Sequence, residues 1–111
     1  MTVNELKEKQ IFETVQEKGN ESAEITKPFC CDLLSVAMSK APAGCAWVTI
    51  MGNINTLAVA SLTEAACIVL AEGVQMDEAA VEKAAAQEIP VFCTDKPIFE
   101  AALEIERLLY G

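Results

Sequence analysis

Three short apolar segments in the second half of the chain constrain its fold more than any other feature. They are "CAWVTIM" (45–51), "ACIVLA" (66–71) and "VFCT" (91–94), and each is followed by a stretch that suits a helix. Continuously apolar strands that alternate with helices are typical of a parallel sheet whose two faces are both covered. The pattern therefore predicts an α/β fold of three layers, with a mainly parallel sheet and helices on both faces.

The helical stretches in this half carry signals at their ends. In "DEAAVEKAAAQE" (77–88), Asp77 is placed to cap the N-terminus of a helix. The last helix follows Pro97, and the chain ends at Gly111. The expected packing faces of these two helices are apolar side chains at helical spacing: Val81, Ala84 and Ala85 in the first, and Ile98, Ala102, Ile105 and Leu109 in the second.

The N-terminal part of the chain has a less regular pattern. Thr2 and Glu5 have the spacing of a capping box, which predicts a short helix at the start. "IFETVQ" (11–16) alternates apolar and polar residues as a half-exposed strand does, and "EKGNES" (17–22) is typical of a turn.

The stretch from 25 to 44 predicts a further helix. It begins after Pro28 and is closed by "APAG" (41–44). Its apolar residues at helical spacing are Leu33, Leu34, Ala37 and Met38. No internal repeat or linker is visible, so we expect a single domain over residues 1–111.

The composition is that of a globular protein. Apolar residues make up 52% of the chain and charged residues 23%. No apolar run approaches the ~20 residues that span a bilayer, and the N-terminus lacks the apolar core of a signal peptide. We therefore expect a cytoplasmic protein that does not bind a membrane.

The strongly negative net charge argues against nucleic acids as partners. Seventeen acidic residues against eight basic ones give a net charge of −9, and no Lys or Arg occurs between Lys40 and Lys83. Binding to a polyanion depends on cations that meet phosphates. We therefore expect no nucleic-acid partner.

The cysteines favour free thiols over a disulfide framework or a metal site. There are five of them, Cys30, Cys31, Cys45, Cys67 and Cys93, and most lie in apolar segments. Zinc and iron–sulfur sites usually group closely spaced pairs such as Cys-x-x-Cys, and this chain has no such pair and no His. We expect buried, reduced thiols, with no metal and no cofactor.

Three segments carry a resemblance to a known family. They are "CDLLSVAM" (31–38), "CAWVTIMGNINTLAVASLTEAACIVLAEG" (45–73) and "IPVFCTDKPIFEAA" (89–102). In their order and spacing the chain resembles a stand-alone DRTGG-domain protein, over residues 25–111. This module also occurs in some phosphotransacetylases and CBS-domain pyrophosphatases, and it is related to the N-terminal domain of HPr kinase/phosphorylase.

The motif that names the family is degenerate in this chain. Its equivalent falls on "SAEITKP" (22–28), where Thr26 survives, while the acidic, basic and glycine positions hold other residues. A role of this motif elsewhere in the family therefore does not carry over to these residues.

The resemblance implies a regulatory or ligand-binding module with the fold of the HPr kinase N-terminal domain, often homodimeric. Small stand-alone members are encoded near iron-only hydrogenase and related redox genes in anaerobic bacteria, which implies a regulatory role there. Kinase activity is not implied, because the five glycines form no Gly-x4-Gly-Lys-Ser/Thr run that could hold a phosphate. Without His there is also no Ser-His or Cys-His dyad, so we expect no enzymatic activity and no catalytic residue.

A polar turn in "VTIMGNINTLAVA" (48–60) is the strongest candidate for a ligand site. Ligands of open α/β folds bind outside the carboxyl ends of the strands, where this turn should lie. If Asn53 or Asn55 caps the following helix, the free N–H groups of its first turn can hold a carboxylate or phosphate, and Gly52 lets a ligand approach the backbone. The alternative is ordinary turn chemistry, because Gly and Asn are common in any strand-to-helix turn.

Two further polar residues follow the last predicted strand at the same rim. Thr94 offers a hydroxyl and Lys96 a cation to an anionic ligand, and Thr49 has a similar place on an earlier strand. The alternative is that the threonines bond locally and that Lys96 is solvated. The predicted ligand-binding residues are Gly52, Asn53, Asn55, Thr94 and Lys96.

The sequence thus favours a non-enzymatic module that senses a small anionic ligand, such as a nucleotide, in a redox or hydrogenase-associated system. The alternative is a protein–protein interaction or assembly module, with a redox-system partner and no small-molecule ligand. The apolar segment "CCDLLSVAM" (30–38) could pair with a second copy in a homodimer, whereas Trp47 is expected in the core.

Overall fold

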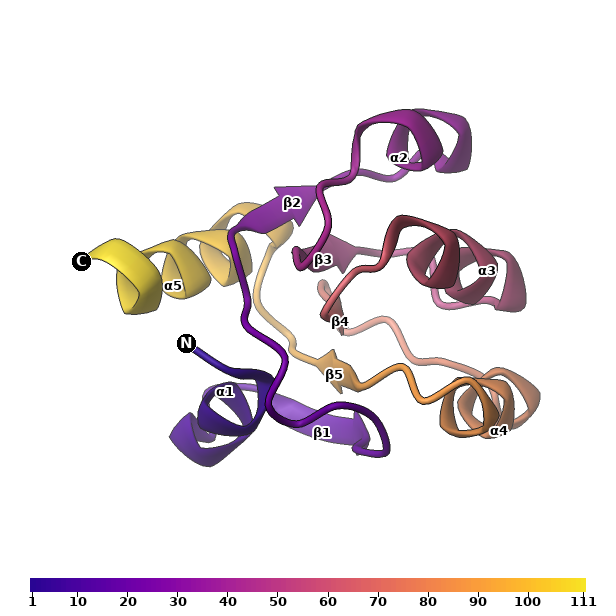
Figure 1. Ribbon diagram of the computed structural model, residues 1–111, viewed down its shortest axis with the longest axis horizontal. Coiled ribbons are helices and arrows are strands. Elements are labelled where there is room, and N and C mark those ends of the chain that lie inside the picture. Colours follow the sequence, from indigo (N-terminus) through magenta and orange to yellow (C-terminus); the bar gives the residue numbers. More distant parts are fainter.

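The computed structural model describes all residues 1–111 and has five helices and a sheet of five strands (Figure 1). The order along the chain is α1 (Val3–Lys9), β1 (Glu13–Gln16), β2 (Pro28–Cys30), α2 (Leu34–Lys40), β3 (Ala46–Thr49), α3 (Ile54–Thr63), β4 (Cys67–Leu70), α4 (Glu78–Ala86), β5 (Val91–Cys93) and α5 (Ile98–Tyr110). None of the helices combines the length and the apolar character needed to cross a lipid bilayer.

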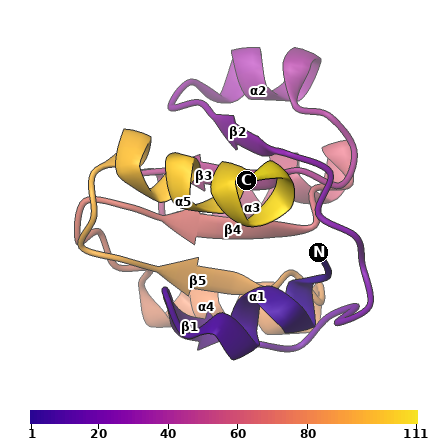
Figure 2. The ribbon, with the colours of Figure 1, turned by 90° about the vertical axis from the view of Figure 1, so that its left-hand side faces the viewer.

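The sheet has the strand order β1-β5-β4-β3-β2. Strands β2 to β5 run parallel, and β1 pairs with β5 in the antiparallel sense. Helices α2, α3 and α4 cover one face of the sheet, and α1 and α5 cover the other (Figures 1 and 2). The predicted three-layer α/β fold with a mainly parallel sheet is therefore confirmed.

Two hydrophobic clusters, one on each side of the sheet, form the core. Val48 belongs to the cluster under α1 and α5, and Trp47 to the cluster under α2, α3 and α4. Both are fully buried, because successive side chains of a strand point to opposite faces. This explains why the strands appear as continuous apolar runs, and it places Trp47 in the core as expected. The indole Nε1 of Trp47 donates to the carbonyl oxygen of Cys31 at 3.0 Å.

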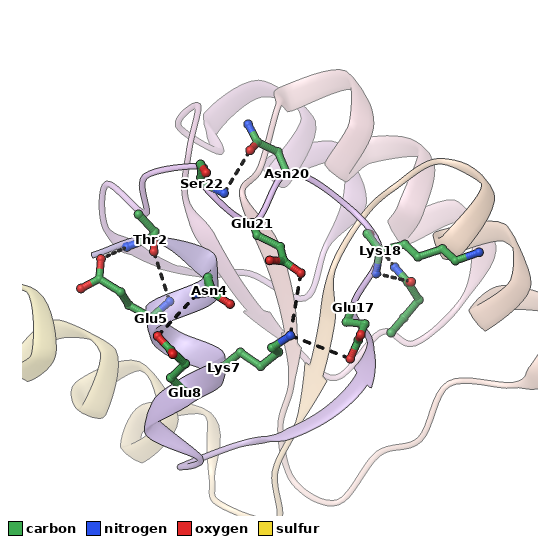
Figure 3. A network of polar contacts seen from close by, with 11 residues as sticks. Thr2, Asn4, Glu5, Lys7, Glu8, Glu17, Lys18, Asn20, Glu21 and Ser22 are labelled. Carbon is green, nitrogen blue, oxygen red and sulfur yellow. Dashed lines mark hydrogen bonds and ion pairs between the residues drawn. The ribbon is translucent and has the colours of Figure 1, made fainter.

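The predicted capping box is present at the start of α1 (Figure 3). The Glu5 backbone N–H donates to Thr2 Oγ1 at 3.1 Å, and the Thr2 N–H donates to Glu5 Oε1 at 3.0 Å. Hydrogen bonds from Thr2, chiefly from its backbone N–H, lower the pKa of the Glu5 carboxyl. On the same helix, Lys7 lies within 4 Å of two carboxylates of the following segment, those of Glu17 (3.9 Å) and Glu21 (3.8 Å).

Strand β2 is the main departure from the sequence prediction. The stretch from 25 to 44 forms this strand first and only then the helix α2, in which Ala37 alone is fully buried. Because β2 has only three residues, it is too short to show the pattern of a strand in the sequence. Its first residue is Pro28, which an edge strand tolerates because one side of it has no ladder partner.

The helices of the second half begin largely as predicted. Asp77 caps α4 and accepts from the Ala80 N–H at 2.8 Å. The buried face of α4 is Ala80 and Ala84, whereas Ala85 is only half-buried. In α5, Ile105 is fully buried and its predicted neighbours pack around it: Ile98, Ala102 and Leu109.

Candidate functional site

The parallel strands end on one edge of the sheet, and the segments that follow them form a rim. After β3 the rim consists of residues 50–53, after β4 of residues 71–77, and after β5 of residues 94–97. Backbone hydrogen bonds tie the last two segments together, because Glu72 N–H donates to the Lys96 carbonyl at 2.9 Å and Gly73 N–H to the Thr94 carbonyl at 3.0 Å. The segments after β4 and β5 therefore form one connected part of the predicted carboxyl-end rim.

At the start of α3, Asn53 is the capping residue. Its Oδ1 accepts from the Thr56 N–H at 3.1 Å, whereas Asn55 lies exposed in the first turn. The four consecutive backbone N–H groups of residues 52–55 donate to no protein acceptor. The structure thus brings Gly52, Asn53 and Asn55 together in a short segment with unused backbone donors.

Gly52 is held close to the neighbouring segment of the rim. A Cβ atom at this position would lie 3.2 Å from the Gln75 carbonyl oxygen and 3.3 Å from Leu70 Cδ1. These distances are tighter than most contacts of real Cβ atoms. Any larger side chain here would push on the backbone of residues 75 and 76, so the glycine allows the two segments to approach each other.

Thr49 has a local structural role at the end of β3. Its hydroxyl is fully buried, donates to Asp32 Oδ1 at 2.7 Å, and accepts from the Met51 N–H at 3.2 Å. The same Asp32 oxygen accepts from the Ile50 N–H at 2.9 Å. The Thr49 hydroxyl is therefore engaged by protein partners, one near in the chain (Met51) and one distant (Asp32). Asp32 was not singled out as a site residue in the sequence, because it lies 17 residues before its partner.

The side chain of Lys96 is used elsewhere. Its Nζ lies 2.7 Å from Glu104 Oε1 of α5 and 6.0 Å from the centroid of the Phe12 ring. Its backbone N–H donates to Thr94 Oγ1 at 3.2 Å. The ammonium group is therefore paired on the α5 side of the sheet and is not brought to the α3 start.

A hollow in the rim lies between the ends of β4 and β5 and the start of β1. It has a volume of about 240 Å³, below the roughly 300–1,000 Å³ of typical ligand sites. Thr94 lines it, as do two carboxylates, those of Glu13 and Asp95. The remaining lining residues are Ile11, Gly73, Val74, Gln75 and Cys93. The sequence prediction missed this hollow because Glu13 comes from the antiparallel edge strand, far from the other residues in the chain.

Cys93 in this hollow is held as a neutral thiol. Burial raises its pKa, and so do the nearby carboxylates of Glu13 and Asp95. Its Sγ donates to Glu13 Oε2 at 3.8 Å. Because the thiolate is the nucleophilic form of cysteine, this environment disfavours covalent chemistry at Cys93.

Burial divides the five free cysteines into three groups. Cys45 and Cys67 are fully buried, and desolvation raises the pKa of Cys45 to about 11 and that of Cys67 still further. Cys31 and Cys93 are half-buried and Cys30 is exposed, so the expectation of buried thiols is correct for only part of the set. No three or more Cys, Asp or Glu side chains are grouped so that they could hold a metal ion.

The structure places one more carboxylate at a helix end. Glu72 and Gly73 both have positive φ, 61° and 74°, so the chain turns sharply after β4. This turn directs Glu72 Oε2 to the N–H of Ile98, from which it accepts at 3.1 Å. Glu72 therefore caps α5, whose own preceding residue, Pro97, has no side chain that could do so.

No protein-family model matches the chain, and no curated protein sequence matches it. Among solved structures it is similar to the crystal structure of the CBS and DRTGG domains of the regulatory region of Clostridium perfringens pyrophosphatase, complexed with its activator, diadenosine tetraphosphate. The TM-score is 0.72 at 11% sequence identity, and the match covers 94% of this chain and 45% of that chain. At this identity the likeness concerns the fold: the chain has a DRTGG-like α/β fold.

Proposed function

We propose that this chain is a non-enzymatic regulatory domain that binds a nucleotide at the carboxyl-end rim, with a phosphate group at residues 52–55. The observation that carries the proposal is the set of four consecutive backbone N–H groups without a protein acceptor at the start of α3. The similar pyrophosphatase regulatory region, whose structure contains a nucleotide activator, supports a role in regulation.

The start of α3 suits a phosphate group. The first N–H groups of a helix point outward from its N-terminus, and the helix dipole favours negative charge there. Asn53 holds the first turn in place through its bond to Thr56 N–H, so the donors need little rearrangement on binding. Asn55, exposed in the same turn, adds an amide that can donate to a phosphate oxygen.

The acidic hollow suits the uncharged part of a nucleotide. Gln75 connects the two places, because its carbonyl lies against Gly52 and the residue also lines the hollow. The carboxylates of Glu13 and Asp95 can accept hydrogen bonds from ribose hydroxyls or base amino groups, and they oppose a second phosphate there. Thr94 offers its hydroxyl, and Lys96 supports the loop through its backbone contacts with Glu72 and Thr94.

Binding without catalysis fits the chemistry of these residues. The rim offers backbone donors, amides and carboxylates, but no histidine and no activated nucleophile. Following the resemblance of its sequence, we place the regulatory role in a redox or hydrogenase-associated system. The competing proposal is an interaction module with a redox-system partner and no nucleotide. It draws on exposed apolar residues at α2, such as Leu33 directly before the helix and Met38 within it.

Two substitutions of Asn53 test the proposal without removing the helix cap. Asp and Ser both cap helices well, so Asn53→Asp and Asn53→Ser should fold like the wild type. A carboxylate at position 53 repels a phosphate bound to the neighbouring N–H groups, whereas a hydroxyl does not. We expect Asn53→Asp to weaken nucleotide binding about tenfold or more relative to Asn53→Ser.

The measurement is isothermal titration calorimetry, after a thermal-shift comparison of AMP, ADP, ATP and diadenosine tetraphosphate. A ligand that binds the folded state raises the apparent stability, so the screen selects the nucleotide for the titration. Equal affinity of the two variants would exclude a phosphate at the start of α3. If no nucleotide shifts the melting of the wild type while a redox protein co-purifies, the interaction module is the better description.

A further inference from the structure

Carboxylates flank the start of α3 on both sides along the rim. The strand order β1-β5-β4-β3-β2 places the end of β3 between the end of β2 and the ends of β4 and β5 (Figure 1). Asp32 follows β2 and accepts from the Ile50 N–H at 2.9 Å, so its charge lies beside the segment that leads into α3. On the other side lies the hollow that Glu13 and Asp95 line. Residues 52–55 therefore lie between one carboxylate and a pair of carboxylates.

Almost no positive charge offsets these carboxylates at the rim. Lys96 is the only basic residue in the three rim segments, and no basic residue lines the hollow. The Nζ of Lys96 is paired with Glu104 at 2.7 Å on the α5 side of the sheet. The rim segments contain two further carboxylates, those of Glu72 and Asp77, which cap α5 and α4. A ligand with several negative charges therefore finds no free cation here to neutralise it.

The start of α3 provides donors for one phosphate group. The backbone N–H groups of residues 52–55 have no protein acceptor, and a single phosphate presents three acceptor oxygens. Gln75 lies against Gly52 and also lines the hollow, so these donors and the hollow are adjacent. The hollow has a volume of about 240 Å³, which is small for a ligand site. In a nucleoside monophosphate the phosphate is bonded directly to the ribose, and this short connection matches the two adjacent places.

We propose that Asp32, Glu13 and Asp95 are specificity-determining residues, which restrict the ligand to a nucleoside monophosphate. This inference rests on the proposed nucleotide binding at residues 52–55 and adds the class of nucleotide. A second phosphate that extends along the rim approaches a carboxylate in either direction, and like charges without an intervening cation repel each other. A phosphate chain that points into solvent gains no donor and remains in the field of the same carboxylates. Each added phosphate therefore lowers the affinity.

The first test is isothermal titration calorimetry with AMP, ADP and ATP in the presence of EDTA, so that no divalent cation masks the phosphates. The three probes share base and ribose and differ only in the number of phosphates. We expect Kd to rise in the order AMP, ADP, ATP, with a difference of about tenfold or more between AMP and ATP. Diadenosine tetraphosphate, the activator in the similar pyrophosphatase structure, should bind no more tightly than ATP. Equal or tighter binding of ATP than of AMP overturns the proposal.

The second test separates charge repulsion from a lack of space. The triple variant Glu13→Gln/Asp32→Asn/Asp95→Asn removes three charges and keeps a side-chain oxygen at each position. The amide oxygen at position 32 can still accept from the Thr49 hydroxyl and the Ile50 N–H. We expect the ratio of Kd for ATP to Kd for AMP to fall by about threefold or more. Asp32→Asn alone should lower this ratio part of the way.

Glu64→Gln is the matched control. Glu64 is exposed and follows α3 at its far end, about 15 Å from the start of the helix. Removal of this charge should leave the ratio unchanged. If the triple variant and Asp32→Asn, with circular dichroism showing an intact fold, also leave the ratio unchanged, the proposal is overturned, because the preference for AMP then comes from lack of space.

This inference and the proposed nucleotide binding fail separately. If ATP binds as tightly as AMP while Asn53→Asp weakens the binding of both, the phosphate remains at the start of α3 and only the selectivity is wrong. If none of the nucleotides binds, the proposed function itself is wrong, and the selectivity is wrong with it.

Discussion

Asp32 holds the end of β3 through a single carboxylate oxygen. Oδ1 accepts from the buried Thr49 hydroxyl and from the Ile50 N–H, and the Thr49 oxygen in turn accepts from the Met51 N–H. The path of the chain from the sheet toward residues 52–55 therefore depends on this side chain. A buried hydroxyl that loses its acceptor costs more than the hydrogen bond itself contributed.

Removal of this carboxylate should destabilise the fold measurably. Asp32→Ala leaves the Thr49 hydroxyl without its acceptor, so we expect the free energy of unfolding to fall by about 1–3 kcal/mol. Urea denaturation measures the change. Asp95→Ala is the matched control, because Asp95 is exposed and accepts no hydrogen bond; it should change stability by less than about 0.5 kcal/mol. Equal effects of the two substitutions would contradict the role assigned to Asp32.

At the scale of secondary-structure elements, the helix starts show two ways of satisfying free N–H groups. Helices α1, α3 and α4 are capped by a residue directly before the helix, and these caps involve contacts over three residues of sequence. Helix α5 instead receives Glu72, which is 26 residues away. Local caps were therefore recognisable in the sequence, whereas the cap of α5 depends on how the rim segments pack.

The capping box of α1 should make a small, pH-dependent contribution to stability. The pKa of the Glu5 carboxyl is lower in the folded state than in the unfolded chain, so its contribution is complete above the unfolded pKa. It is lost as the pH falls through the folded pKa. Glu5→Gln keeps a hydrogen-bonding cap without the charge.

The comparison uses urea midpoints of the wild type and Glu5→Gln at about pH 7 and about pH 3. We expect the wild type to be more stable than Glu5→Gln at neutral pH and the difference to shrink at acidic pH. A difference that grows on acidification would contradict the direction of the pKa shift.

At the scale of the whole molecule, covering both faces of the sheet separates the cysteines by accessibility. Cys45 and Cys67 lie in the cores on either side of the sheet and are fully buried, whereas Cys30 lies on the exposed edge strand β2. A buried thiol reacts only when the fold opens around it. The reactivity of the buried thiols of Cys45 and Cys67 therefore shows whether the three layers remain packed.

Thiol labelling of the native protein should follow this order. With a small maleimide, we expect the exposed Cys30 to react before Cys45 and Cys67, which should react only at the rate of unfolding. Burial and the Asp32 carboxylate raise the pKa of Cys30, so its labelling should speed up with rising pH. Peptide mass spectrometry identifies the modified residue, and labelling in denaturant provides the control in which all five react. Rapid labelling of Cys67 in the native protein would contradict its place in the core.

The central strands and most helices were predictable because their signals are local. Strands β3, β4 and β5 are buried on both faces, so their composition alone distinguishes them, and a helix cap is recognised by the spacing of two residues. Gly52, Asn53 and Asn55 could be placed at a strand-to-helix turn for the same reason. Strand β2 was missed because three residues at a sheet edge are too few to form a periodic pattern.

The side-chain contacts around the rim leave no local pattern in the sequence from which they could be predicted. The pairing of Thr49 with Asp32, of Lys96 with Glu104, and of Glu13 with Cys93 depends on which segments the sheet order makes adjacent. Local propensity determines which segments become strands and helices, but it does not state their order in the sheet. The amino-acid pattern was therefore sufficient for the class of fold and for the place of the α3 start. The position of the Lys96 charge and the acidic hollow follow from packing, because each joins residues that are distant in the chain.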